Sequence, residues 1–376
     1  MSQPVPISRL LRHPVATSES LESSALLIGA AVFVVTTIVA LLTFAGHELP
    51  ISGRGSVGQF VALGSATAAA TVFVMARVLL NTNSTPAAEL RRGQDIPSVR
   101  LHWYDIGALA LAHAFIALLG WLGIADLMGK SFTGALIFTL PGAVLAAVAI
   151  AVSSYAVFLS AVNLTPISVS VILVVFLVAG ALTSMLSATD PLWWQKNLST
   201  LGISDDISAL AFNLTLIIAG VVVTTIAHYA TVAIPVGTAK EVSGRNLVRG
   251  ALVLIGVLLA CVGIFPVDRF LTAHNVAASG MAAVYVALVL GLRRFVPAMP
   301  GVFILLGYVF VGVIVVLAVF FATGYYNLTA VELVAFLLIF SWLILLIRNT
   351  GAMTKSERSS ADQESTLVTG ASADAP

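Results

Sequence analysis

The chain has 376 residues, of which 59% are hydrophobic and only 9% are charged, and its mean hydropathy is +1.05. Ordinary soluble domains carry about 25% charged residues, so the composition excludes that class and predicts a polytopic membrane protein. The formal net charge of +1 gives no reason to expect a nucleic-acid partner. The single cysteine, Cys261, lies in an apolar run and is interpreted as a small buried hydrophobic residue.

Apolar runs long enough to cross a bilayer as helices follow one another along the chain. The first is about 21 residues long, longer than a signal-peptide core, so we expect it to be retained. The predicted fold is an all-α transmembrane bundle of about ten spans. These spans are expected near residues 25–45, 57–80, 105–125, 134–161, 167–188, 207–235, 247–266, from 274, 301–322 and 328–347.

The predicted organisation has four parts. Residues 1–24 form a cytoplasmic N-terminal segment, residues 25–166 a four-helix membrane extension, and residues 167–347 a six-helix membrane unit. Residues 348–376 have almost nothing to bury, which predicts a disordered cytoplasmic tail. Within the fourth span, Pro141 is followed by Gly142, a pair that predicts a kink.

The basic residues predict the orientation of the ten spans. With both termini on one side, that side holds every Lys and Arg except Arg54, Lys130, Lys196 and Arg269. This asymmetry places both termini in the cytoplasm of a plasma membrane. The loops around residues 190–206 and 268–274 then lie on the outer face.

The stretch from 190 to 228 concentrates polar, aromatic and helix-capping residues in one place. Its first half is too polar for hydrocarbon and its second half too apolar for water, so it is expected to enter the membrane near Ile207. Ser204 or Asp205 is expected to cap that helix, and Asp206 lies where a helix N-terminus favours negative charge.

Polar residues of this stretch and of the loop before 274 predict one ligand site on the outer face. Paired tryptophans suit the membrane interface, while amides and hydroxyls can orient a polar group. We therefore expect a lipid headgroup or small amphiphile as the partner, without cofactor, metal ion or catalytic residue. The predicted ligand-binding residues are Asp190, Trp193, Trp194, Gln195, Asn197, Ser199, Asn213, Asp268 and His274.

Short motifs in the second half of the chain carry a resemblance to a known family. They are the run Asn197-Leu198-Ser199-Thr200-Leu201-Gly202, then Phe212-Asn213 with Gly220, then Gly263-Ile264-Phe265-Pro266-Val267-Asp268, and finally His274. With these, residues 167–347 resemble the bacterial membrane family called domain of unknown function 998, itself similar to the Frag/DRAM/Sfk group. The resemblance implies a polytopic bundle with polar residues at its outer face, and no established activity.

Two alternative functions stay open at this point. One is proton-coupled transport through His113, His228 and Glu332, because titratable groups inside a membrane are costly to keep.

The other alternative is a hydrolase or transferase, in which His274 acts as general base, Asp268 orients it, and Ser184, Ser187 or Ser199 is the nucleophile. Neither a nucleophile elbow nor an HExxH motif occurs. These residues can also have structural roles alone, in which the tryptophans anchor the chain at the membrane interface and Asp268 pairs with Arg269.

Overall fold

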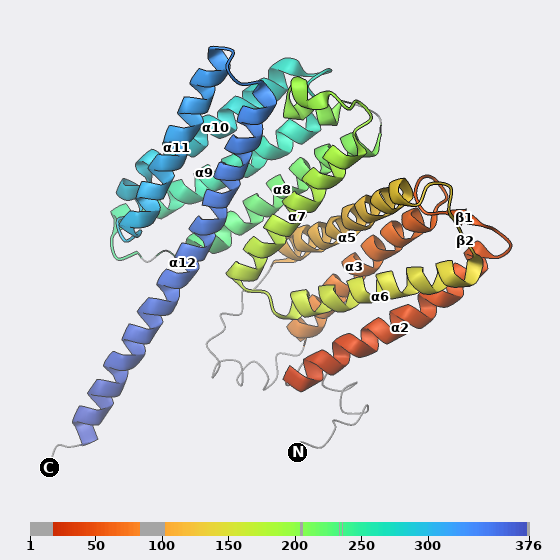
Figure 1. Ribbon diagram of the computed structural model, residues 1–376. Coiled ribbons are helices and arrows are strands. Elements are labelled where there is room, and N and C mark those ends of the chain that lie inside the picture. The colour runs from red at the N-terminus through yellow and green to blue at the C-terminus, as the bar shows by residue number, and fades with distance from the viewer. Residues whose placement is uncertain (1–17, 83–101, 204–205, 233, 235, 374–376) are drawn as a thin grey trace. The chain divides into compact units, whose positions relative to one another are not determined.

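The structure, a computed structural model, describes residues 18–82, 102–203, 206–232, 234 and 236–373 (Figure 1). Within these ranges, ten helices are long and apolar enough to cross a membrane. The extended structure described there is one antiparallel ladder between β1 (Leu49–Pro50) and β2 (Leu136–Ile137). The prediction of an all-α bundle with ten spans is confirmed.

The long helices follow the predicted apolar runs. Two short 3-10 helices, η1 (Trp193–Gln195) and η2 (Leu198–Gly202), lie between the fifth and sixth spans. The ten long helices are α2 (Ser18–Phe44), α3 (Val57–Thr82), α5 (Trp103–Ser131), α6 (Thr139–Val162), α7 (Pro166–Ser187), α8 (Ile207–Val232), α9 (Ala239–Ile264), α10 (Leu271–Phe295), α11 (Gly301–Ala322) and α12 (Leu328–Ala373).

The chain divides into two compact units. The first comprises residues 1–189 and 204–218, and the second comprises residues 190–203 and 219–376. This division differs from the expected boundary at residue 166, because α7 packs on α5 in the first unit. Thr183 on α7 donates a hydrogen bond to the carbonyl of Leu119 on α5, at 3.0 Å between oxygens.

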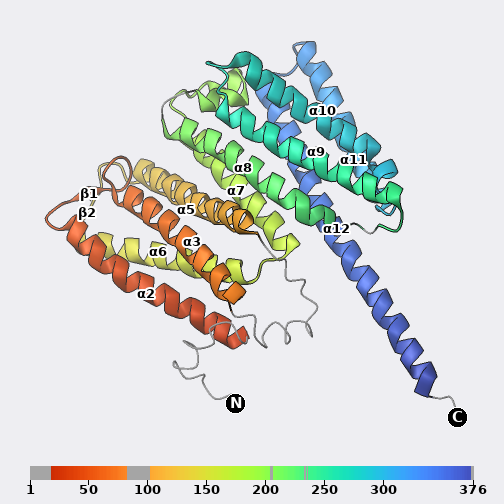
Figure 2. The ribbon, with the colours of Figure 1, turned by 180° about the vertical axis from the view of Figure 1, so that it is seen from behind.

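Small residues on α6 organise one end of the first unit. Both α2 and α3 pack on α6, and α3 also packs on α5 (Figure 2). Small side chains let helix backbones approach closely in a membrane, where packing replaces the hydrophobic effect as the driving force. The buried core there consists of Ala40, Phe44, Val57, Val61, Ala143, Ala146 and Ala149.

The expected kink at Pro141 is wrong, because α6 begins later than predicted. Its first residue is Thr139, so Pro141 falls in the first turn. A missing N–H leaves no helical hydrogen bond unmade in that turn. The pair Pro141-Gly142 therefore begins a helix instead of bending one.

A buried tryptophan organises the second unit. Here α9 packs on α10, α10 on α11, and α11 on α12. The Trp342 ring of α12 is fully buried, stacked on Phe303 at 5.2 Å and edge-to-face with Tyr285 at 5.4 Å between ring centroids. A side chain at position 307 would bring its Cβ to 2.8 Å from Trp342 Nε1, so this packing requires Gly307.

The two chain ends also differ from expectation. Residues 18–24 belong to α2, and residues 1–17 of the expected N-terminal segment lie outside the described residues. The tail predicted to be disordered from residue 348 instead continues α12 to Ala373. Alanine, glutamate, lysine, glutamine and leucine there all have high helix propensity, and no proline occurs before Pro376.

Candidate functional site

Segment 190–203 belongs to the second unit and is shaped by its own polar side chains. Asp190 Oδ1 accepts a hydrogen bond from the backbone N–H of Leu192 at 2.9 Å, and Asp190 Oδ2 accepts one from Lys196 Nζ at 3.2 Å. Asn197 Oδ1 accepts from the Thr200 hydroxyl at 3.1 Å. These local bonds favour the tight turns of η1 and η2 over a continuous helix.

The Asp190 carboxylate is exposed, and its pKa is lower than the ordinary value. The backbone N–H of Leu192 is the main cause, and the hydrogen bond and charge of Lys196 act in the same direction. Both interactions favour the charged carboxylate.

The start of α12 holds this segment through two hydrogen bonds. Glu332, one turn inside the helix, accepts a hydrogen bond from the backbone N–H of Leu198 at 2.5 Å. Asn327 donates from Nδ2 to the Trp194 carbonyl at 3.0 Å, and its Oδ1 accepts from Ala330 N–H, which caps α12. One helix end thus fixes both 3-10 turns.

A third hydrogen bond joins the segment to α10. Ser199 Oγ lies 2.9 Å from His274 Nε2, and His274 Nδ1 lies 2.8 Å from the Phe265 carbonyl oxygen. A carbonyl can only accept, so Nδ1 carries a proton, and the Nε2 of neutral His274 accepts from the serine hydroxyl. The imidazole is only 4% exposed, while Ser199 is partly exposed.

In the structure, the backbone carbonyl of Phe265 orients His274 in place of the expected Asp268. The Asp268 carboxylate lies 3.6 Å from the Arg269 guanidinium, and the carbonyl of Phe265 takes the imidazole N–H instead. The chain turns after Pro266, so a backbone oxygen three residues before Asp268 reaches the ring first.

The structure brings together most of the predicted binding residues. Within the second unit, Asp190, Trp193, Trp194, Gln195, Asn197 and Ser199 share one segment, and Ser199 contacts His274. The Trp194 side chain is 48% exposed. Asn213 instead belongs to the first unit, on α8.

The other candidate serines and the observed cap of α8 also belong to the first unit. Ser184 donates to the Ser208 carbonyl on α8, and Ser187 ends α7. Asp206 caps α8, since its Oδ1 accepts from Ala209 N–H at 3.0 Å. The expected caps Ser204 and Asp205 lie outside the described residues.

The three titratable groups inside spans have separate surroundings. In the first unit, His113 bonds through Nδ1 to the Leu109 carbonyl at 2.7 Å and through Nε2 to the Ser160 hydroxyl at 2.9 Å. Glu332 bonds to Leu198, and the His228 side chain is exposed on α8 in the second unit. These contacts give no support to a proton relay.

Three contributors were missed by reasoning from the sequence. Asn327 lies directly before the tenth span, a position that favours a helix cap and was a usable signal. The contact of His274 with the Phe265 carbonyl had no signal in the sequence, because every residue has a backbone carbonyl. Thr329, three residues before Glu332 on the same helix face, is 6% exposed, and its hydroxyl has no hydrogen-bond partner among the described residues.

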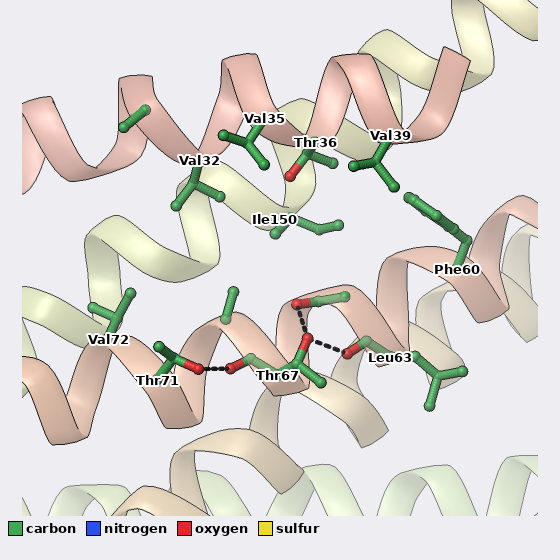
Figure 3. Close-up of a pocket in the computed structure, with 13 residues that line it drawn as sticks. Val32, Val35, Thr36, Val39, Phe60, Leu63, Thr67, Thr71, Val72 and Ile150 are labelled. Atoms are coloured by element: carbon green, nitrogen blue, oxygen red, sulfur yellow. Dashed lines mark hydrogen bonds between the residues drawn. The ribbon is translucent and has the colours of Figure 1, made fainter. Parts of the chain in front are cut away.

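The first unit contains a cavity of about 640 Å³ between α2, α3 and α6 (Figure 3). Its walls are mainly apolar, with Val35 and Val39 on α2 and Ile150 on α6 pointing into it. The Thr67 and Thr71 hydroxyls donate to carbonyls of their own helix. The lining has no charged group for chemistry, so we place the candidate site in the second unit.

In the described part of the chain, no three His, Cys, Asp or Glu residues cluster in a way that could hold a metal ion.

Comparison with known proteins does not assign the chain to a family. Nothing matches the chain among protein-family models, curated proteins or solved structures. The resemblance to domain of unknown function 998 stays a prediction.

Proposed function

We propose that this membrane protein binds the headgroup of a lipid or small amphiphile at segment 190–203 of its second unit. The observation that carries the proposal is the set of hydrogen bonds by which Glu332, Asn327 and His274 hold the segment at three points. Three such links order a short polar segment, and an ordered polar surface lowers the entropic cost of binding a ligand.

The chemistry of the surrounding side chains favours an amphiphile. The exposed Trp194 and Leu192 offer apolar surface, while the Lys196 ammonium and the partly exposed Asn197 amide offer polar contacts. Thr329 adds a buried hydroxyl in the first turn of α12, for which the described residues offer no hydrogen-bond partner. A polar group left unpaired in this way costs about 1–3 kcal/mol, which a bound water or ligand atom would offset.

We further propose that the segment faces the outside of a plasma membrane and that both termini are cytoplasmic. The support is the excess of basic residues in the loops of the terminal side. Five of these, Arg9, Arg12, Arg91, Arg92 and Arg100, lie outside the described residues. The proposed relation to domain of unknown function 998 rests on the motifs at 197–202, 212–220 and 263–274 alone.

Native mass spectrometry of the detergent-extracted protein tests the binding proposal. We expect co-purified lipid on the wild type and its loss on Trp194→Ala or Asn197→Ala. The matched control is Trp103→Ala, which removes an 83% exposed tryptophan from the first unit and should leave lipid retention unchanged. Equal retention in all four proteins would count against the site.

Thiol labelling tests the orientation. Cysteines introduced at Lys196 and Arg269, both exposed, in a Cys261→Ala background should react with a membrane-impermeant maleimide from outside intact cells. Labelling of the two positions from opposite sides would overturn the proposed topology.

A further inference from the structure

We propose that Ser199 and His274 form a nucleophile and general-base pair that transfers the acyl group of an amphiphilic carboxylic ester. This inference rests on the proposed binding function and adds a chemical step at the same segment. Its geometric basis is two consecutive hydrogen bonds. His274 Nδ1 lies 2.8 Å from the Phe265 carbonyl oxygen, and His274 Nε2 lies 2.9 Å from Ser199 Oγ.

The tautomer of His274 is the one that base catalysis needs. The Phe265 carbonyl holds the proton on Nδ1, which leaves the Nε2 lone pair directed at the Ser199 hydroxyl. In serine hydrolases the same orientation is provided by a carboxylate. A carbonyl dipole stabilises the imidazolium of the transition state less than a charge does, so we expect a slower reaction than in a triad.

Ser199 is placed unlike three hydroxyls inside the membrane spans, Ser153, Ser154 and Thr215. Ser153, Ser154 and Thr215 donate to the carbonyl four residues earlier in their own helices, which leaves them occupied. Ser199 lies in a 3-10 turn between two membrane spans, and its hydroxyl bonds to the His274 imidazole. Glu332 fixes the neighbouring residue, Leu198, and so limits the movement of the serine backbone.

Exposed apolar side chains precede each member of the pair in the chain and indicate the substrate class. Leu192 and Trp194, 51% and 48% exposed, precede Ser199, and Phe270 and Leu271, 51% and 58% exposed, precede His274. At the edge of a membrane, such side chains favour a ligand with an acyl chain. An ester of a long-chain acid presents its carbonyl at the depth where these chains meet water.

The proposed step conserves atoms and charge. Ser199 Oγ attacks the ester carbonyl carbon while its proton moves to His274 Nε2. The tetrahedral intermediate then loses the alcohol, which takes the proton from Nε2, and leaves an ester on Ser199. Water or a second alcohol attacks this ester by the reverse sequence, releases the acid or a new ester, and restores both side chains.

Covalent labelling of the purified full-length protein tests the inference. Two fluorophosphonate probes are used, one with a long alkyl chain and one with a methyl group. The long-chain probe should label Ser199, located by peptide mass spectrometry, and should react faster than the methyl probe. Ser199→Ala should stay unlabelled, and His274→Asn should react on the order of 100-fold more slowly.

Ser160→Ala is the matched control, because Ser160 makes the same bond to His113 in the first unit. It should be labelled like the wild type. Absence of an adduct on wild-type Ser199 overturns the catalytic pair, and this arm does not depend on the folding of any variant. An unchanged rate in His274→Asn overturns the base, and equal rates with the two probes overturn the amphiphilic substrate.

The outcome is separable from that of the binding experiment. Lipid retained in native mass spectrometry together with an unlabelled Ser199 would remove only the catalytic inference. Labelled Ser199 without retained lipid, at equal rates for both probes, would overturn the binding proposal and the substrate class together.

Discussion

Two histidines, one in each unit, make the same pair of hydrogen bonds in different surroundings. His113 and His274 each bond through Nδ1 to a backbone carbonyl and through Nε2 to a serine hydroxyl, and both are about 5% exposed or less. The carbonyl of His113 is four residues earlier in its own helix, whereas that of His274 lies nine residues away, beyond the start of α10.

The difference between the serine partners decides what each pair can do. Ser160 is part of α6 and His113 of α5, so this pair links two membrane helices, and the Phe73 ring of α3 lies 4.7 Å from the His113 ring. Ser199 is part of a short polar segment that α12 holds from the other side. The same donors and acceptors thus link two membrane helices in the first unit and orient a hydroxyl of a short polar turn in the second.

The largest loss of stability is expected from removing the Glu332 hydrogen bond, which holds the segment of the His274 pair and has no counterpart described at the His113 pair. Glu332→Ala leaves the Leu198 N–H without this acceptor, and a donor left unpaired costs about 1–3 kcal/mol. The free energy of unfolding in mixed micelles should fall by that amount. Glu332→Gln keeps an acceptor and should lose less, so equal losses would show that the hydrogen bond is not the source.

A smaller effect is expected at the second anchor. Asn327→Ala removes the α12 cap and the bond to the Trp194 carbonyl, and should lower the free energy of unfolding by about 1–2 kcal/mol. Asn327→Asp keeps the cap but not the donor. It should therefore retain most of the stability while reducing lipid retention, and a full loss of stability would contradict this division.

In the first unit, Ser160→Ala should lower the free energy of unfolding by about 1 kcal/mol, the net value of one hydrogen bond. Thermal unfolding in detergent measures it. Lipid retention and probe labelling should not change, because the serine belongs to the helix pair alone. A change in either would mean that the two histidine pairs are not functionally distinct.

The smallest effect concerns the exposed Asp190. Its pKa is lowered in the folded protein by Leu192 N–H and Lys196, so its stabilisation is complete above the ordinary carboxyl pKa and is lost as pH falls through the folded value. The difference in unfolding between wild type and Asp190→Asn should thus shrink from about pH 6 to about pH 3. A difference that grows with acidity would contradict the assignment.

The sequence predicted the spans well because bilayer thickness sets their length and composition. It also marked segment 190–203 through its density of polar residues between two apolar runs. It did not predict which groups meet: Glu332 was considered for a proton relay, and its partner is the backbone N–H of Leu198. Asp268 was expected beside His274, but a carbonyl invisible in the side-chain pattern occupies that position.

The path of the chain between the units limits how the protein can be dissected. Residues 190–203 join the second unit before the chain returns to the first at 204–218 and leaves again within α8. No single cut yields two complete halves. A fragment that begins at α9 would lack Ser199, and one that ends at α8 would carry Ser199 without His274, so split versions should regain labelling only when both fragments are expressed together.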